Sequence, residues 1–180
     1  MGGWVEREGD ALRDRYPQVD LWTGLLSPER NRWLCDVVAG RRTPEPHNPR
    51  RELHAEADRV RVSPEHWAYL KIADGCDNRC TYCTIPDIRG PLRSKPSREA
   101  VGETQTLVDE GVREIVLVAQ DTCAYGHDVD GTSHLPALLR DLAKIDGLQW
   151  LRVMYAHPAH FTDELVEVIA DEPKVCNYVD

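Results

Sequence analysis

The sequence lacks the features that would place it in a membrane, in a secretory pathway or along a nucleic-acid backbone. No apolar run approaches the roughly 18 residues of a membrane span, and the first residues lack the basic-then-apolar layout of a signal peptide. Positive charge is also scarce, since 22 basic side chains stand against 31 acidic ones in 180 residues, a formal net charge of −9. We therefore expect a cytoplasmic protein with no membrane partner and no extended nucleic-acid surface.

The six cysteines fall into two groups. Three of them form a cluster with the spacing C-x3-C-x2-C: Cys76, Cys80 and Cys83. The other three lie scattered in apolar or turn-like sequence, and we predict that they are small buried hydrophobic residues: Cys35, Cys123 and Cys176. In a reducing cytosol, clustered cysteines are more often metal ligands or catalytic groups than disulfides.

The first 40 residues are predicted to differ from the rest. Their pattern favours a helix over 4–16, a short strand over 19–22 and a second helix over 28–39. Residues 41–60 then contain three closely spaced prolines among charged residues, which indicates a semi-rigid linker. We place the domain boundaries accordingly, at 1–40, 41–60 and 61–180.

The remainder alternates strands and helices. Strands are predicted at 69–73, 115–119, 150–155 and 175–179. The continuous apolar run at 115–119 is typical of a strand covered on both faces. The helices between them begin at Ser97 as N-cap, near Leu135, and after Thr162 as N-cap.

This alternation predicts an α/β fold with a parallel sheet, and both an open sheet and part of a barrel fit it. Because the chain stops at the fourth strand, we expect it to be a fragment.

The cysteine cluster follows the first of these strands. Three thiolates suit either an iron–sulfur cluster or zinc. A structural zinc site normally uses four protein ligands in two separated pairs, and no second pair lies nearby. A four-iron cluster held by three cysteines keeps one iron open for another ligand, so the count favours the cluster. Zinc stays as the alternative.

The sequence around the cluster, YLKIADGCDNRCTYCTIPDIRG at residues 69–90 and RSKP at 93–96, resembles the radical S-adenosylmethionine (SAM) methylthiotransferases. The resemblance implies a partial radical SAM (β/α) barrel of three to four βα units, preceded by the tail of an amino-terminal α/β domain. It implies that Cys76, Cys80 and Cys83 hold a 4Fe–4S cluster whose open iron chelates SAM. It also places Tyr82 near the adenine and Gln120 and Asp121 at the SAM site.

Two further stretches of sequence resemble one branch of the methylthiotransferase family in particular. The AQDT stretch at residues 119–122 and the carboxy-terminal residues 173–180 resemble the methylthiotransferases of a ribosomal protein. That branch modifies the β-carbon of an aspartate in the twelfth small-subunit ribosomal protein, with an electron donor such as flavodoxin or ferredoxin. Two alternatives stay open: a transfer-RNA methylthiotransferase, and a non-catalytic iron–sulfur or zinc module.

Two features depart from the family pattern or leave a role open. Gly3 stands where the family has a cysteine of a second cluster, so a second cluster is not supported, and residues 1–40 resemble only the remnant of the amino-terminal domain. We expect the fragment alone not to complete methylthiolation. His157 follows the third strand and could face the same site, although a turn histidine is the commoner interpretation.

Overall fold

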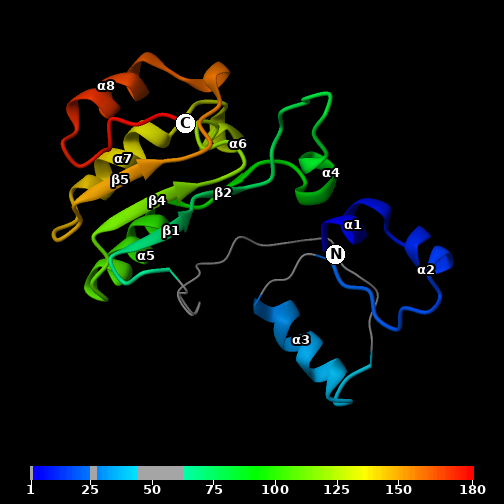
Figure 1. The fold of residues 1–180 in the computed structure, drawn as a ribbon. Helices are drawn as coiled ribbons and strands as arrows, with labels where there is room; N and C mark the ends of the chain where they lie inside the picture. Colours follow the sequence, from blue (N-terminus) through cyan, green and yellow to red (C-terminus); the bar gives the residue numbers. More distant parts are fainter. Residues whose placement is uncertain (1, 25–27, 44–62) are drawn as a thin grey trace. The chain divides into compact units, whose positions relative to one another are not determined.

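The computed structural model describes residues 2–24, 28–43 and 63–180 (Figure 1). Contacts divide the described chain into two compact units. We call residues 2–24, 28–43 and 78–90 the amino-terminal unit, and residues 63–77 and 91–180 the sheet unit. Each unit is described by itself.

A three-stranded parallel sheet forms the centre of the sheet unit. The strands are β1 (Trp67–Lys71), β4 (Glu114–Val118) and β5 (Trp150–Val153), in the order β1-β4-β5 (Figure 1). Both pairings are parallel, which confirms the predicted sheet and three of the predicted strands within a few residues of their bounds.

One face of the sheet carries most of the core. Two rows of paired residues lie on this face because side chains alternate along a strand: Ala68, Ile115 and Leu151, then Leu70, Leu117 and Val153. All six are at most 3% exposed. On the opposite face Tyr69 is half exposed, whereas its pairing partner Val116 is buried, so the middle of β4 is covered on both faces as predicted.

Three helices pack against the buried rows. They are α5 (Ser97–Asp109), α7 (Leu135–Ala143) and α8 (Asp163–Asp171). Their buried faces enter the same apolar cluster as the strands, most fully through Leu135, Leu138, Leu139, Leu142 and Leu165. Thr162 caps α8 as predicted, since its hydroxyl accepts a hydrogen bond from the Leu165 N–H at 3.2 Å. The predicted cap of α5 was one residue late, because Ser97 is the first helical residue and Pro96 the cap.

Several short elements were not predicted, because they are too short to show periodicity. In the sheet unit these are β2 (Ala73–Asp74), which pairs antiparallel with β3 (Arg93–Ser94), α6 (His127–Asp130), and the 3₁₀ turn η1 (Pro158–His160). In the amino-terminal unit α4 (Ile85–Arg89) follows the cysteines.

The fourth strand predicted at 175–179 is not formed. Only one parallel bridge joins Val175 to Leu151, and residues 176–180 form no strand. The side chain of Asp180 instead accepts hydrogen bonds from the backbone N–H groups of Tyr155 at 2.9 Å and Ala156 at 3.3 Å. The last residues therefore close the end of β5 rather than extend the sheet.

The amino-terminal unit is mainly helical. The helix predicted at 4–16 is two helices, α1 (Gly2–Glu8) and α2 (Ala11–Arg15), because the chain turns at Gly9 with a φ of 56°. The strand predicted at 19–22 was wrong, since this segment is irregular, although Trp22 is buried with Val5 and Leu12. The helix predicted at 28–39 is confirmed as α3 (Pro28–Val38). Most of the predicted linker 41–60 lies outside the described residues.

The three scattered cysteines differ in burial. Cys123 is fully buried, as predicted, whereas Cys176 is half-buried and Cys35 is exposed on α3. The prediction was therefore wrong for Cys35. No described helix is long and apolar enough to span a bilayer.

Candidate functional site

The three parallel strands end at the same edge of the sheet. The loops that follow them carry the residues singled out from the sequence: Cys76 after β1, Gln120 and Asp121 after β4, and His157 after β5. Two hydrogen bonds carry the pairing beyond the strands, from Ile72 N–H to Val118 O at 3.0 Å and from Met154 N–H to Leu117 O at 3.2 Å. Side chains from separate strands are thus gathered at one edge, the usual place for ligand sites in parallel sheets.

The start of the cysteine loop is fixed within the sheet unit. Gly75 adopts a φ of 79°, which favours glycine, and its N–H donates to the buried carboxylate of Asp74 at 3.1 Å. The carboxylate of Asp77 accepts a hydrogen bond from the Leu92 N–H at 3.0 Å. Between them, Cys76 is only 8% exposed. Its thiol therefore sits on a well-anchored segment.

Cys80 and Cys83 belong to the amino-terminal unit. A turn joins them, in which the Cys83 N–H donates to Cys80 O at 3.0 Å, and both are partly buried. The Cys83 sulfur accepts a hydrogen bond from the Ile85 N–H at 3.5 Å, a contact that suits a sulfur carrying negative charge. No cysteine forms a disulfide among the described residues, which include all six. Tyr82, between these two cysteines, is 89% exposed.

The loop after β4 is bound to the end of β5. Thr122 donates from its hydroxyl to Met154 O at 2.7 Å and from its N–H to Tyr155 O at 3.1 Å. The carboxylate of Asp121 is nearly buried and lies 2.6 Å from Nδ1 of His160. Oε1 of Gln120 is buried without a hydrogen-bond partner among the described residues. Asp121 is therefore held at the strand edge, and Gln120 beside it offers a buried acceptor without a partner among the described residues.

Sequence reasoning missed His160. His157 is the N-cap of η1 and His160 is its last residue, and together with Asp121 they offer three potential ligand atoms that all lie within 4.8 Å of one another. The ring of His127 packs edge-on against His160 with centroids 5.3 Å apart. A His-x2-His pair directly after a strand was the sequence signal that could have found this cluster.

Tyr155 marks a strained point at the end of β5. Its φ of 59° is the only positive value at a non-glycine position among the described residues. A left-handed conformation costs roughly 1–2 kcal/mol for a residue with a Cβ. The contacts of Tyr155 with Thr122 and Asp180 hold this conformation. The strain lies beside the His157–His160 turn, where a fixed backbone aims side chains at the strand edge.

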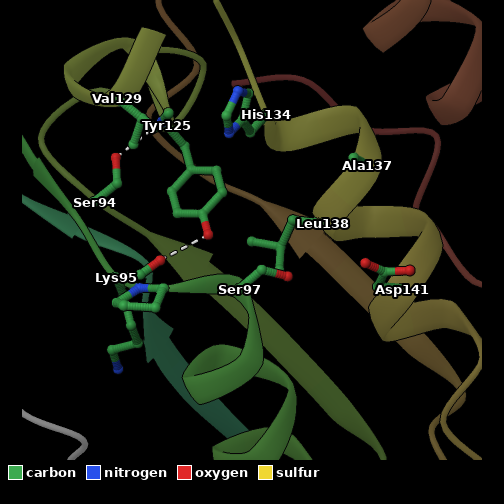
Figure 2. A pocket seen from close by; sticks show the side chains of 11 residues that line it. Ser94, Lys95, Ser97, Tyr125, Val129, His134, Ala137, Leu138 and Asp141 are labelled. Atoms are coloured by element: carbon green, nitrogen blue, oxygen red, sulfur yellow. Dashed lines mark hydrogen bonds between the residues drawn. The ribbon is translucent and has the colours of Figure 1, made fainter.

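The RSKP segment has a structural role. Lys95 is fully buried, and its ammonium lies 2.6 Å from the carboxylate of Glu103 on α5. Tyr125 donates from its hydroxyl to Lys95 O at 2.7 Å, and burial raises the pKa of Tyr125 to about 12 (Figure 2). Ser94 donates to Asp128 from both its N–H and its hydroxyl. These contacts join α5 to the loop before α6.

A cavity of about 530 Å³ lies beside this segment (Figure 2). It lies between the start of α5 and α7, and its wall includes Ser97, Tyr125, His134, Leu138 and Asp141. Gly126 borders it with a φ of 95°, and a Cβ there would meet His134 at 2.5 Å. Glycine is therefore required at this position, and the cavity wall is closely packed there.

Comparison with known proteins identifies the class. The family model for the radical SAM superfamily matches residues 70–180, which include the cysteine loop and all three strand ends. The chain belongs to the radical SAM superfamily.

Curated relatives agree with the more specific resemblance. The chain is 48% identical over 170 residues to the ribosomal protein uS12 methylthiotransferase RimO of Heliobacterium modesticaldum, covering 94% of this chain and 37% of that protein. It is 43% identical over 180 residues to the RimO of Elusimicrobium minutum, covering 99% and 41% respectively. The chain thus spans about two fifths of the length of these relatives.

Among solved structures, the chain is similar to the radical SAM methyltransferase TsrM of Kitasatospora setae, with a TM-score of 0.48 and 19% identity over 61% of this chain and 21% of that chain. A likeness at this level carries no argument about function.

Proposed function

We propose that the chain carries the radical SAM part of a methylthiotransferase that acts on an aspartate of ribosomal protein uS12. The observation that carries the proposal is the cysteine triad in the segment that follows β1 and β2, in a chain that belongs to the radical SAM superfamily. The identity of 48% to a uS12 methylthiotransferase over nearly the whole chain supports the substrate class. In this proposal residues 1–40 are the remnant of an amino-terminal domain, 41–60 a linker and 61–180 the radical SAM core.

The donor set fits a 4Fe–4S cluster. Cys76, Cys80 and Cys83 are three soft sulfur ligands outside any disulfide, and three ligands leave the fourth iron to a small molecule. When bound, the cluster supplies the electron for reductive cleavage of SAM, which yields the radical that removes a hydrogen atom from the acceptor carbon. A flavodoxin or ferredoxin is the proposed source of that electron.

The residues at the strand ends are proposed to bind SAM. Gln120 presents a buried amide oxygen with no partner among the described residues, which a donor group of a ligand would satisfy. Asp121 presents a carboxylate that suits the ammonium group of an amino acid. Tyr82 presents an exposed ring that an adenine could cover. The chain's own part is to hold the Asp121 carboxylate through His160 and the backbone of this loop through Thr122.

The proposal is tested by anaerobic reconstitution of the chain with iron and sulfide, followed by dithionite, SAM and an assay for 5′-deoxyadenosine. We expect about four irons per chain and 5′-deoxyadenosine formation that Cys80→Ala abolishes. Cys35→Ala is the matched control, because this exposed cysteine lies on α3 outside the triad. Product formation that survives Cys80→Ala, or a chain that stays colourless and binds no iron after reconstitution, would contradict the proposal.

A second experiment tests the substrate class. Addition of uS12 is expected to increase 5′-deoxyadenosine formation, whereas transfer RNA is expected to have no effect. Stimulation by transfer RNA alone would move the proposal to the transfer-RNA branch while retaining the radical chemistry.

A further inference from the structure

A second group of metal-ligating side chains lies outside the cysteine triad. Asp121 follows β4, and His157 and His160 follow β5, so three donors from two adjacent strand ends converge within 4.8 Å. Among the residues that the structure describes, this is the only such group of three or more His, Cys, Asp or Glu.

Local backbone geometry explains the convergence. His157 and His160 are three residues apart across a 3₁₀ turn, and a 3₁₀ helix has about three residues per turn, so positions i and i+3 share a side. The Nδ1 atom of His157 accepts a hydrogen bond from the Ala159 N–H at 3.2 Å, and the ring centroids of His157 and His160 lie 5.4 Å apart. The ring of His160 is held 2.6 Å from Asp121. The turn therefore presents two imidazoles toward one carboxylate.

The distances suit a small cation after modest side-chain rotation. Zinc binds nitrogen and carboxylate oxygen at about 2.0–2.2 Å, which places tetrahedral ligand atoms roughly 3.3–3.5 Å apart. The hydrogen bond from His160 to Asp121 must lengthen by less than about 1 Å, and the widest pair in the group must close by up to about 1.5 Å. The ion would replace that hydrogen bond by two coordinate bonds.

The donor chemistry also favours a divalent cation. Asp121 is 2% exposed, and a buried carboxylate is stabilised by a positive charge beside it. Two imidazoles and one carboxylate form the ligand set of zinc sites that keep one position open for water or a ligand.

We propose that Asp121, His157 and His160 form a zinc-binding site separate from the cysteine triad. The proposal goes beyond the proposed function and does not depend on it. If both hold, zinc and SAM compete for the carboxylate of Asp121.

The test is calorimetric titration of Zn²⁺ into the chain carrying Cys80→Ser and Cys83→Ser, which leaves Cys76 as the single thiol of the triad. We expect one zinc per chain. His157→Asn and Asp121→Asn should each weaken binding by at least about tenfold, since even loss of a group that only orients a metal ligand costs that much. His157 is exposed, so its variant should keep the fold, which circular dichroism checks.

The matched control is His134→Asn. His134 lies 2.9 Å from the carboxylate of Asp130, so it forms a histidine–carboxylate pair in the same unit, but no third such donor joins it among the described residues. We expect this variant to bind zinc with unchanged affinity.

Three results would overturn the proposal: no zinc uptake, equal affinity in the His157→Asn and Asp121→Asn variants, or equal loss in His134→Asn. Co²⁺ provides an independent readout, because nitrogen and oxygen ligation gives visible bands without the strong thiolate charge-transfer band. A thiolate band would assign the ion to cysteines instead. Neither measurement uses an iron–sulfur cluster or SAM, so failure here is distinguishable from failure of the proposed function.

Discussion

The two units of the chain differ in what stabilises them. The sheet unit buries a continuous apolar cluster from β1, β4, β5, α5, α7 and α8, whereas the buried cluster of the amino-terminal unit is Val5, Leu12 and Trp22 with a few partly buried neighbours. Small cores yield little net stability, and bound metals often supply the rest. Because Cys80 and Cys83 lie in the amino-terminal unit, metal binding should stabilise that unit more than the sheet unit.

The largest difference between the units is expected in thiol reactivity. Burial raises the pKa of Cys123 from 9.0 to about 12, whereas Cys35 is exposed on α3. Iodoacetamide should modify Cys35 more than about a thousandfold faster, because Cys123 must wait for unfolding of the sheet unit. Peptide mass spectrometry measures both rates, and comparable rates would show that the sheet unit opens easily.

The raised pKa of Cys123 also predicts that the unfolding free energy depends on pH. Its folded pKa is raised, so the unfolded chain loses this proton first as pH rises. The contribution to stability is therefore complete below about pH 9 and is lost between about pH 9 and 12. With Cys123→Ala, the urea concentration at the unfolding midpoint should fall less steeply as pH rises from about 9 to 12. An equally steep fall in this variant would contradict the role of Cys123.

The next largest effect is expected at the buried ion pair. Lys95→Met removes the ammonium that neutralises Glu103 inside the sheet unit and should cost about 3–5 kcal/mol of unfolding free energy. The double variant Lys95→Met with Glu103→Leu should recover most of this loss. Urea unfolding followed by circular dichroism tests both, and equal loss in the double variant would mean that packing rather than charge is responsible.

Equivalent leucine truncations compare the two cores directly. Leu139→Ala in α7 should cost about 2–5 kcal/mol, because a fully buried side chain leaves a cavity in a large core. Leu12→Ala in α2 should lie at the low end of that range, since a small cluster collapses more readily. Urea unfolding of each variant measures the loss, and a larger loss for Leu12→Ala would reverse the ranking of the units.

A smaller effect is expected from a helix cap. Thr162→Ala removes the hydroxyl that accepts from Leu165 N–H and should cost about 1 kcal/mol. Arg140→Gln on α7 removes an exposed ion pair with Glu164 on α8 and should cost less than about 0.5 kcal/mol. Thermal melts of the two variants side by side rank them, and the reverse order would contradict the assignment of Thr162 as the cap.

Much of the sheet unit followed from the sequence, because apolar periodicity over ten or more residues defines helices such as α5 and α7. The fourth strand failed because Val175 pairs at one position while Asp180 caps Tyr155, a long-range contact that no local pattern reveals. Residues 4–16 have helical spacing, but the positive φ of Gly9 breaks this segment into two helices.

The residues of the candidate site likewise divide into those that local sequence could predict and those that it could not. The cysteine spacing and the polar residues at strand ends carry local signals, so Cys76, Cys80, Cys83, Gln120 and Asp121 could be nominated from the sequence. His160 was missed: the His-x2-His spacing was its local signal, but its contact with Asp121 depends on the 3₁₀ turn after β5. A turn of three residues is too short to produce a periodic pattern in the sequence, so the contacts that it creates cannot be predicted from periodicity.

The central claim is that Cys76, Cys80 and Cys83 hold a cluster with one iron open to SAM. The most direct test is electron paramagnetic resonance of the reconstituted, dithionite-reduced chain with and without SAM. The account predicts a reduced 4Fe–4S signal that changes shape when SAM is added, because SAM binds the open iron. A signal that SAM leaves unchanged, or no iron–sulfur signal after reconstitution, would contradict it.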